Sequence, residues 1–289
     1  SEYSYACKKL GIKILPPDIN YGEGAFSVDH GNIRYGLTAI KSLGRPVIEA
    51  IIRERNLNGP YRDFKDLVER LSSKEINKRT VENLIKSGAL DCFHVTRKQQ
   101  MIVYASVIDS IQKERKNEIA GQMSLMDLLG EEDQQSFQIS YPDVGEYEKE
   151  QKLAMEKEVL GIYVSGHPLE DDIERLERSV TAHTSDFVID EETGKTKIHD
   201  RESCIIGGLI SEMSVKLTKK NQNMAFITLE DLRGTVEVVV FPRQYATYQS
   251  LLREDAKVFI KGTTQISEEE SKVICNQIIS FEDSRQELW

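Results

Sequence analysis

The residues best suited to a chemical task are one aromatic side chain and two lysines in the last third of the chain. Phe226 lies in an alternating apolar segment, and Lys219 and Lys220 precede it in a basic loop. An aromatic ring offers a plane on which a base stacks, and ammonium groups neutralise phosphates. The pattern therefore indicates contact with single-stranded nucleic acid. The alternative is that Phe226 packs beneath a neighbouring domain, and the sequence leaves both readings open.

Alternation of side chains predicts which face Phe226 occupies. In residues 224–231 every second side chain, Ala225, Ile227 and Leu229, is expected to face a core. A turn at 232–234 leads to a second strand in which Glu237 is a poor core residue and marks the outer face. The two-residue period places Phe226 on that same outer face.

A second candidate site consists of two glycine-containing turns, 41–45 and 86–89, between predicted helices. The N–H groups at the start of the helix after such a turn, together with the helix dipole, suit a phosphate oxygen. Lys41, Arg45 and Lys86 add positive charge beside these turns. The arrangement predicts a tandem helix-hairpin-helix that grips the DNA backbone without reading its sequence. The alternative for either turn alone is an ordinary connection between helices.

The distribution of charge supports separate surfaces for separate partners. The chain has 289 residues and a net charge of −10. Residues 31–119 contain 17 Lys and Arg against 11 Asp and Glu, whereas residues 120–200 contain 7 against 20. Both predicted hairpins lie in the basic part, which favours DNA as their ligand. The acidic part is interpreted mainly as a solvated helical linker.

The elements expected to position these residues divide the chain into three parts. Helical periodicity from Ile33 to about Arg115 predicts an α-helical module at 1–117. Residues 118–200 are predicted to hold an exposed linker with a short apolar peptide suited to another protein's groove, and then connecting helices. His167 in this part is interpreted as structural. In residues 201–289 we predict strands at 204–216, 224–231, 236–240, 257–266 and 272–281, with a helix at 242–252. This order predicts a five-stranded OB-fold barrel, and the fold class is α+β multidomain.

Composition excludes several other classes of function. No apolar run reaches the length of a membrane span, and the N-terminus has no secretory pattern. The chain has no initiator Met and reads as a cut from a longer protein. The four cysteines are far apart and form no CxxC pair, so we expect reduced thiols and no metal site.

Several phrases resemble the C-terminal half of the alpha subunit of bacterial DNA polymerase III. They are LGIKILPPDIN (10–20), IRYGLTAIKSLG (33–44), NKRTVENLIKSGALD (77–91), LGIYVSGHPL (160–169) and TKKNQNMAFITLEDLRGTVEVVVFP (218–242). They follow the order of the family and span almost the whole chain. The resemblance is therefore more specific than any single motif.

The resemblance implies roles for named residues. The tandem hairpins would hold duplex DNA behind the primer terminus through Lys41, Ser42, Gly44, Arg45, Lys86, Ser87 and Gly88. Ser42 departs from the usual pattern, in which a glycine often stands. The barrel would guide single-stranded template through Lys216, Lys219, Lys220 and Phe226.

The resemblance also implies a peptide that binds the sliding clamp, formed by Gln122, Ser124, Leu125 and Met126. Gln122 would hydrogen-bond the clamp while Leu125 and Met126 fill its pocket. Met126 replaces the Phe that is frequent in the family, which retains volume and flexibility.

The resemblance places the catalytic carboxylates and their Mg²⁺ ions in a palm domain upstream of residue 1. We therefore expect a fragment without catalytic residues or cofactor, inactive alone, in the bacterial cytoplasm and away from membranes. Further replisome subunits are possible partners. A stand-alone single-stranded nucleic-acid-binding protein and a fragment of an error-prone paralogue remain as alternatives. The phrase around Phe226 and Glu237 also resembles the anticodon-binding barrel of class II aminoacyl-tRNA synthetases.

Overall fold

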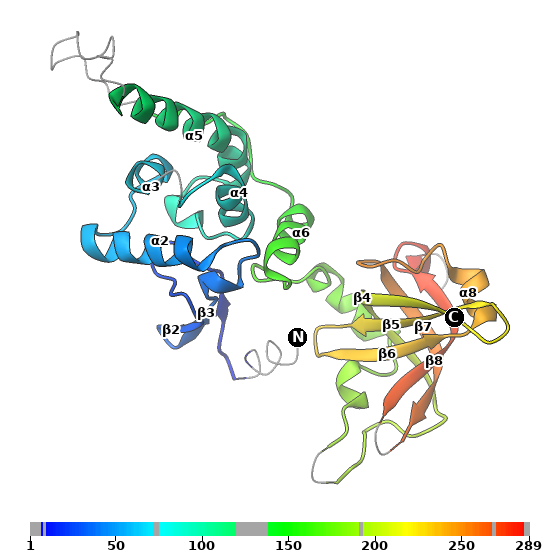
Figure 1. The fold of residues 1–289 in the computed structure, drawn as a ribbon. Helices are drawn as coiled ribbons and strands as arrows, with labels where there is room; N and C mark the ends of the chain where they lie inside the picture. The colour runs from blue at the N-terminus through cyan, green and yellow to red at the C-terminus, as the bar shows by residue number, and fades with distance from the viewer. Residues whose placement is uncertain are drawn as a thin grey trace. The chain divides into compact units, whose positions relative to one another are not determined.

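The computed structural model describes residues 7, 10–71, 75–119, 138–190, 193–267 and 270–285. Contacts divide the chain at Gly166, into a helical unit, Gly11–Gly166, and a barrel unit that begins at His167 (Figure 1). Each unit has its own apolar core. Within the described ranges, none of the helices combines the length and the apolar character needed to cross a bilayer.

The helical unit contains a small three-stranded sheet together with 3₁₀ turns and α-helices. Its strands are β1 (Ile14–Leu15), β2 (Ser27–Asp29) and β3 (Asn32–Arg34), in the order β1-β3-β2. The 3₁₀ turns are η1 (Leu37–Ala39) and η2 (Asp91–Phe93). The α-helices are α2 (Arg45–Asn58), α3 (Phe64–Arg70), α4 (Lys78–Lys86), α5 (Arg97–Ile119) and α6 (Lys149–Leu160).

The small sheet corrects the prediction of helical structure from Ile33 onward. Ile33 lies in β3, where it pairs with Val28 of β2 and Ile14 of β1. The turn before β3 places His30 and Gly31 at φ 48° and 79°. Two successive residues with positive φ form a tight hairpin turn, which sets the strand pairing. The helical pattern begins only at Leu37, with the single 3₁₀ turn η1.

Polar side chains cap the N-termini of several of these helices. Asn77 accepts a hydrogen bond from the Thr80 N–H at the start of α4. Before α5, the Thr96 hydroxyl accepts a hydrogen bond from the Gln99 N–H at 3.2 Å. Asp63 caps α3 in the same way. Each cap satisfies a backbone donor that the helix itself leaves unpaired.

α6 packs into the helical unit, because Val159 and Leu160 belong to its core. The sequence predicts these residues in the connecting segment 118–200, whereas the compact unit runs from Gly11 to Gly166. The N–H of Lys41 donates to the carbonyl of Val159 at 2.8 Å and joins α6 to the first glycine turn.

The barrel unit begins with short helices and continues with five strands. The helical turns are η4 (Glu170–Asp172), α7 (Ile173–Ser179) and η5 (Thr184–Phe187). The strands are β4 (Ser203–Leu217), β5 (Asn223–Glu230), β6 (Thr235–Val240), β7 (Lys257–Ile266) and β8 (Ser271–Ser280), with α8 (Pro242–Tyr248) after β6 and η6 (Asp283–Arg285) after β8.

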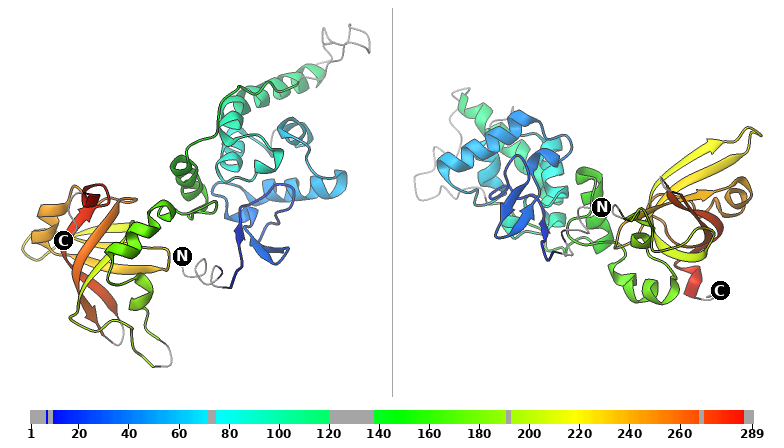
Figure 2. Two further views of the ribbon diagram at one scale, coloured as in Figure 1. Left: turned by 180° about the vertical axis from the view of Figure 1, so that it is seen from behind. Right: turned by 90° about the horizontal axis from the view of Figure 1, so that it is seen from below.

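The five strands close into a barrel in the order β4-β5-β6-β8-β7, and β7 returns to β4. Only the β6–β8 pair is parallel. This confirms the predicted five-stranded barrel, although α8 ends at Tyr248 rather than at 252. The long strand β4 pairs with both β5 and β7, and the right-hand view of Figure 2 shows its yellow end near residue 220 extending from the barrel.

Gly207 and Gly208 allow β4 to take part in both pairings. A Cβ at Gly207 would lie 2.7 Å from the ring of Phe259, and one at Gly208 would collide with the carbonyl of Glu230. Both glycines are therefore required by close packing, Gly208 against the neighbouring strand β5 and Gly207 against Phe259 and against Leu176 of α7.

Candidate nucleic-acid interface

The first glycine turn, 41–45, is open to solvent. Lys41, Ser42, Gly44 and Arg45 are all exposed, while Leu43 between them is 8% exposed and anchors the turn in the core. The structure therefore brings together on one surface all four residues predicted to contact duplex DNA here. A phosphate can approach this turn without displacing core side chains.

The start of α2 supplies backbone donors at this turn. The N–H groups of Val47 and Ile48 both return to the carbonyl of Gly44, at 3.0 and 3.2 Å. Pro46 has no N–H, so the donors that the helix leaves over at this end belong to Gly44 and Arg45. α2 has 14 residues, and its dipole favours an anion at its N-terminus.

Ser42 has a φ of 62°, the left-handed conformation that glycine adopts most readily. The serine that departs from the family pattern thus occupies the position where a glycine would be unstrained. Its hydroxyl accepts a hydrogen bond from Arg79 at 3.2 Å.

Arg79 is a basic residue of this surface that sequence reasoning missed. It is exposed on the first turn of α4, 37 residues from Ser42. Asn83 of the same helix donates to the carbonyl of Lys41 at 2.7 Å and holds α4 against the turn. A signal was present, because Lys78 and Arg79 open a helix whose first turn has no acidic residue. Positive charge at the N-terminus of a helix opposes the helix dipole, so two basic residues there indicate a role other than stabilising the helix.

The second glycine turn, 86–89, is built differently. Ser87 and Ala89 are fully buried, and Gly88 is buried between them at φ 82°. A Cβ on Gly88 would collide with the guanidinium of Arg97. The backbone donors of Ser87, Gly88 and Ala89 all bond to carbonyls of α4.

Lys86 next to this turn is already neutralised. Its ammonium lies 2.9 Å from Glu82 and 2.8 Å from Glu158. Burial lowers its pKa, but the two carboxylates outweigh this effect and the net pKa lies above the ordinary value. Burial and ion pairs thus engage the groups that a phosphate would need at this turn, and the DNA contact expected of Lys86, Ser87 and Gly88 stays a prediction.

The barrel presents Phe226 on its outer face. Ala225, Ile227 and Leu229 are at most 1% exposed, whereas Phe226 between them is half-buried and Glu237 on β6 is exposed. This confirms the predicted facing of β5 and β6. The ammonium of Lys216 lies 4.7 Å from the centroid of the Phe226 ring. A cation over a ring face is attracted by the electron density of the ring.

Lys216, Lys219 and Lys220 are exposed around the loop between β4 and β5. The loop closes on itself, because the N–H of Thr218 donates to the carbonyl of Gln222 at 2.8 Å and Asn221 adopts a φ of 60°. Two of the lysines are thus held on a tight turn and the third lies beside the aromatic ring. The arrangement combines the two components that single-stranded nucleic acid requires.

The remaining predictions concern clamp and metal binding. Gln122, Ser124, Leu125 and Met126 lie outside the described residues, so the clamp peptide stays a prediction. Among the residues that the structure describes, no group of three or more His, Cys, Asp and Glu side chains is arranged to hold a metal ion.

Two family models match the two units. A model described as a helix-hairpin-helix motif matches residues 11–100. One described as an OB-fold nucleic acid binding domain matches residues 205–280.

Among solved structures, the mitochondrial single-stranded DNA-binding protein Rim1 from S. cerevisiae is 14% identical, with a TM-score of 0.24 over 29% of this chain and 96% of that one. The asparaginyl-tRNA synthetase from Pyrococcus horikoshii is 16% identical, with a TM-score of 0.23 over 28% of this chain and 20% of that one.

Curated relatives match almost the whole chain. The DNA polymerase III subunit alpha of Mycobacterium leprae is 32% identical over 96% of this chain and 23% of its own length. The subunits of the same name from Borreliella burgdorferi and Escherichia coli K12 are 33% and 32% identical, over 98% and 97% of this chain. The chain spans about a quarter of the length of these relatives, namely 24% of the subunits from Borreliella burgdorferi and Escherichia coli. This chain therefore belongs to the family of bacterial DNA polymerase III alpha subunits and is homologous to their C-terminal region.

Proposed function

We propose that this chain is the part of a replicative DNA polymerase that holds duplex DNA behind the primer terminus, tethers the enzyme to its sliding clamp and guides single-stranded template. The observation that carries the proposal is the match of 96–99% of the chain to DNA polymerase III alpha subunits. The parent protein would be a DNA-directed DNA polymerase of the bacterial cytoplasm, and further replisome subunits would dock on it.

The duplex grip is assigned to the first glycine turn. Lys41, Arg45 and Arg79 supply positive charge, and the N–H groups of Gly44 and Arg45 supply donors for one phosphate oxygen. Contacts to phosphates carry no sequence information, so this grip would be independent of the base sequence.

The single-stranded contact is assigned to the outer face of the barrel. Phe226 would stack on a base, and Lys216, Lys219 and Lys220 would neutralise phosphates. The face formed by the second and third strands of an OB-fold, with the loop that precedes them, is a common nucleic-acid site.

The clamp tether is assigned to Gln122, Ser124, Leu125 and Met126, on the strength of the family resemblance. A tether raises the effective concentration of the polymerase at the primer end without any new contact there. Processive synthesis would follow from this effect.

Catalysis is assigned to a part of the parent protein outside this chain, where carboxylates would hold Mg²⁺. Primer extension with Mg²⁺ and all four nucleotides tests this assignment. We expect no extension by the 289-residue chain. Clear extension by the pure chain would overturn it.

The first experiment is calorimetry of this chain with the sliding clamp of the same bacterium. Micromolar binding is expected for the native chain and none for a Gln122→Ala, Leu125→Ala, Met126→Ala triple variant. A Gln134→Ala, Gln135→Ala variant in the same segment is the matched control and should bind like the native chain. Absence of native binding would reject the tether.

The second candidate is a stand-alone single-stranded nucleic-acid-binding protein, favoured by the exposed lysines around Phe226. Such a protein would ignore the clamp and prefer an oligonucleotide to a primer–template junction. An error-prone paralogue would share both units, and a fidelity measurement on the parent polymerase distinguishes it.

A further inference from the structure

A second aromatic ring lies on the outer face of the barrel. Phe241 directly follows β6 and is 44% exposed, whereas Val240 before it is fully buried. Its backbone is extended, at φ −66° and ψ 163°, so the strand alternation continues through it. Phe241 therefore shares the face of Val239, the cross-strand partner of Phe226.

The register sets the spacing between the two backbone positions that carry the rings. Phe226 pairs with Val239, and Phe241 lies two residues further along the same strand direction. Diagonal neighbours of this kind are about 7–8 Å apart across an antiparallel pair. The backbone of Phe241 is also fixed from the other side, because its carbonyl accepts the N–H of Tyr245 in α8 at 2.8 Å.

We propose that Phe226 and Phe241 form a platform on which two successive bases of a single strand stack, with Lys216 covering the first ring until a base displaces it. The proposal rests on the proposed single-stranded function of the barrel and adds a second binding residue to it. The displaced ammonium of Lys216 would remain beside the strand and contact a phosphate.

The spacing favours single strands over duplex. Successive bases of one strand in duplex DNA are about 3.4 Å apart along the axis. Rings carried on backbone positions about 7–8 Å apart, roughly twice that spacing, suit a strand that is extended with its bases separated. The platform would therefore accept single-stranded nucleic acid of any sequence, because every base has a flat face.

Charges on the same face set the direction in which the strand continues. Glu212 and Glu237 are exposed and both pair with Thr228, two residues beyond Phe226 along β5. Lys216, Lys219 and Lys220 lie at the opposite end, around the loop before β5. Phosphates would therefore be held at the loop end of the platform and repelled from the acidic end.

The test is binding of a fluorescent (dT) oligomer of about 15 nucleotides by the whole chain, at low salt. Phe226→Ala and Phe241→Ala are each expected to weaken binding about 5- to 150-fold, the value of one base–aromatic stack. The two losses should multiply in the double variant, because each ring holds its own base.

Two further variants separate stacking from packing. Leu217→Ala removes a side chain that is 65% exposed on the other face of the same strands, and it should bind like the native chain. Phe241→Tyr should retain binding, whereas Phe241→Leu, which keeps apolar volume without a ring, should lose it. Thermal unfolding of each variant verifies that the barrel is intact.

The outcomes distinguish this platform from the barrel's proposed function. If Phe226→Ala weakens binding while Phe241→Ala behaves like Leu217→Ala, the platform is rejected and the single-stranded function stands. Native-like binding by Phe241→Leu rejects it in the same way. Absence of binding by the native chain rejects both.

Discussion

Arg97 and Glu156 form an ion pair with a nitrogen–oxygen distance of 3.0 Å, and their side chains are 1% and 0% exposed. The other oxygen of Glu156 accepts the N–H groups of Val164 and Ser165, both at 2.9 Å. Arg97 also donates to Asp91 and to the carbonyl of Lys86. One buried pair thus joins α5, α6 and the carbonyl of Lys86 in the second glycine turn.

Removing one partner of this pair should be costly. Glu156→Ala leaves the guanidinium of Arg97 buried without one of its two carboxylates, and we expect the free energy of unfolding to fall by about 3–5 kcal/mol. The measurement is urea unfolding followed by far-ultraviolet circular dichroism. Glu150→Ala, at an exposed position of the same helix, should cost less than about 1 kcal/mol. Equal losses in the two variants would show that the pair is not specially stabilising.

The two glycine turns should respond oppositely to exchange of serine and glycine. Ser42→Gly relieves a left-handed conformation at φ 62° and should raise the free energy of unfolding by about 0.5–1 kcal/mol. Gly88→Ser creates the same conformation and pushes a side chain into Arg97, so we expect a loss of more than about 2 kcal/mol. Thermal unfolding of both variants measures the difference, and a loss of stability in Ser42→Gly would contradict the reading of the first turn.

Duplex binding should depend on the first turn and not on the second. Arg45→Ala or Arg79→Ala removes one phosphate contact, which should weaken binding of a blunt duplex and reduce the slope of log K against log salt by about 0.9. Lys86→Ala should leave this slope unchanged, because Glu82 and Glu158 already neutralise the ammonium. Arg53→Ala, elsewhere on α2 and paired with Glu75, is the control. A reduced slope in Lys86→Ala would restore the second turn as a DNA contact.

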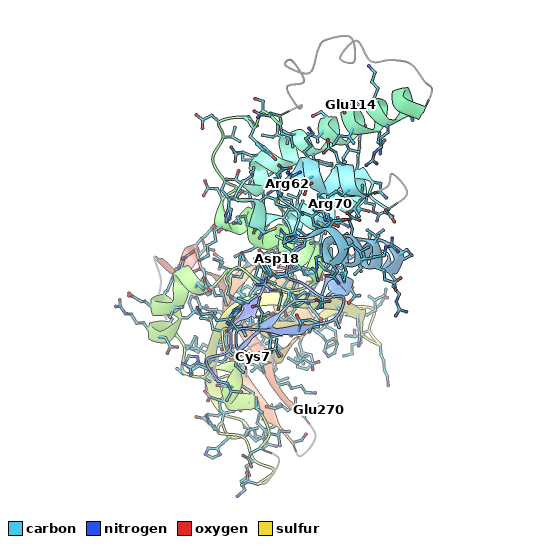
Figure 3. All side chains as sticks on the ribbon, turned by 90° about the vertical axis from the view of Figure 1, so that its left-hand side faces the viewer. Cys7, Asp18, Arg62, Arg70, Glu114 and Glu270 are labelled. Carbon is cyan, nitrogen blue, oxygen red and sulfur yellow. The ribbon has the colours of Figure 1, made fainter. Side chains whose placement is uncertain are left out.

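Asp66 should make the helical unit sensitive to acid. Arg62 and Arg70, labelled in Figure 3, both place a guanidinium nitrogen 3.1 Å from its carboxylate. Burial raises the pKa of Asp66. Hydrogen bonds from the Arg62 backbone and from both guanidinium groups have a larger, opposite effect, so the net pKa lies below its ordinary value. The stability that this carboxylate contributes is therefore complete above about pH 4 and is lost as the pH falls through the folded-state pKa.

Asp66→Asn should remove this dependence. We expect the variant to be less stable than the native chain at pH 7 and to lose less stability between about pH 4 and pH 2.5. Urea unfolding across that range measures both effects. Asp143→Asn, at an exposed position, is the matched control and should follow the native curve. A parallel shift of the Asp66→Asn curve at every pH would contradict the assignment.

Local patterns in the sequence determined much of the barrel and its outer face. The alternation of Ala225, Ile227 and Leu229 with Phe226 follows from the two-residue period of a strand, which no distant contact alters once one face is buried. The caps at Asn77 and Thr96 were equally readable, because each acts on a backbone donor within three residues.

Only the tertiary structure decided which of the two similar glycine turns is accessible. The sequence shows a basic residue and a glycine at both, but Gly88 packs against Arg97, and the guanidinium of Arg97 is paired with Glu156, 59 residues further along the chain. Arg79 lies beside the first turn for a similar reason. Asn83 of the same helix donates a hydrogen bond to the carbonyl of Lys41 and holds α4 against that turn. Local periodicity specifies an element and its faces, whereas the exposure of a charged group depends on which distant segments pack against it.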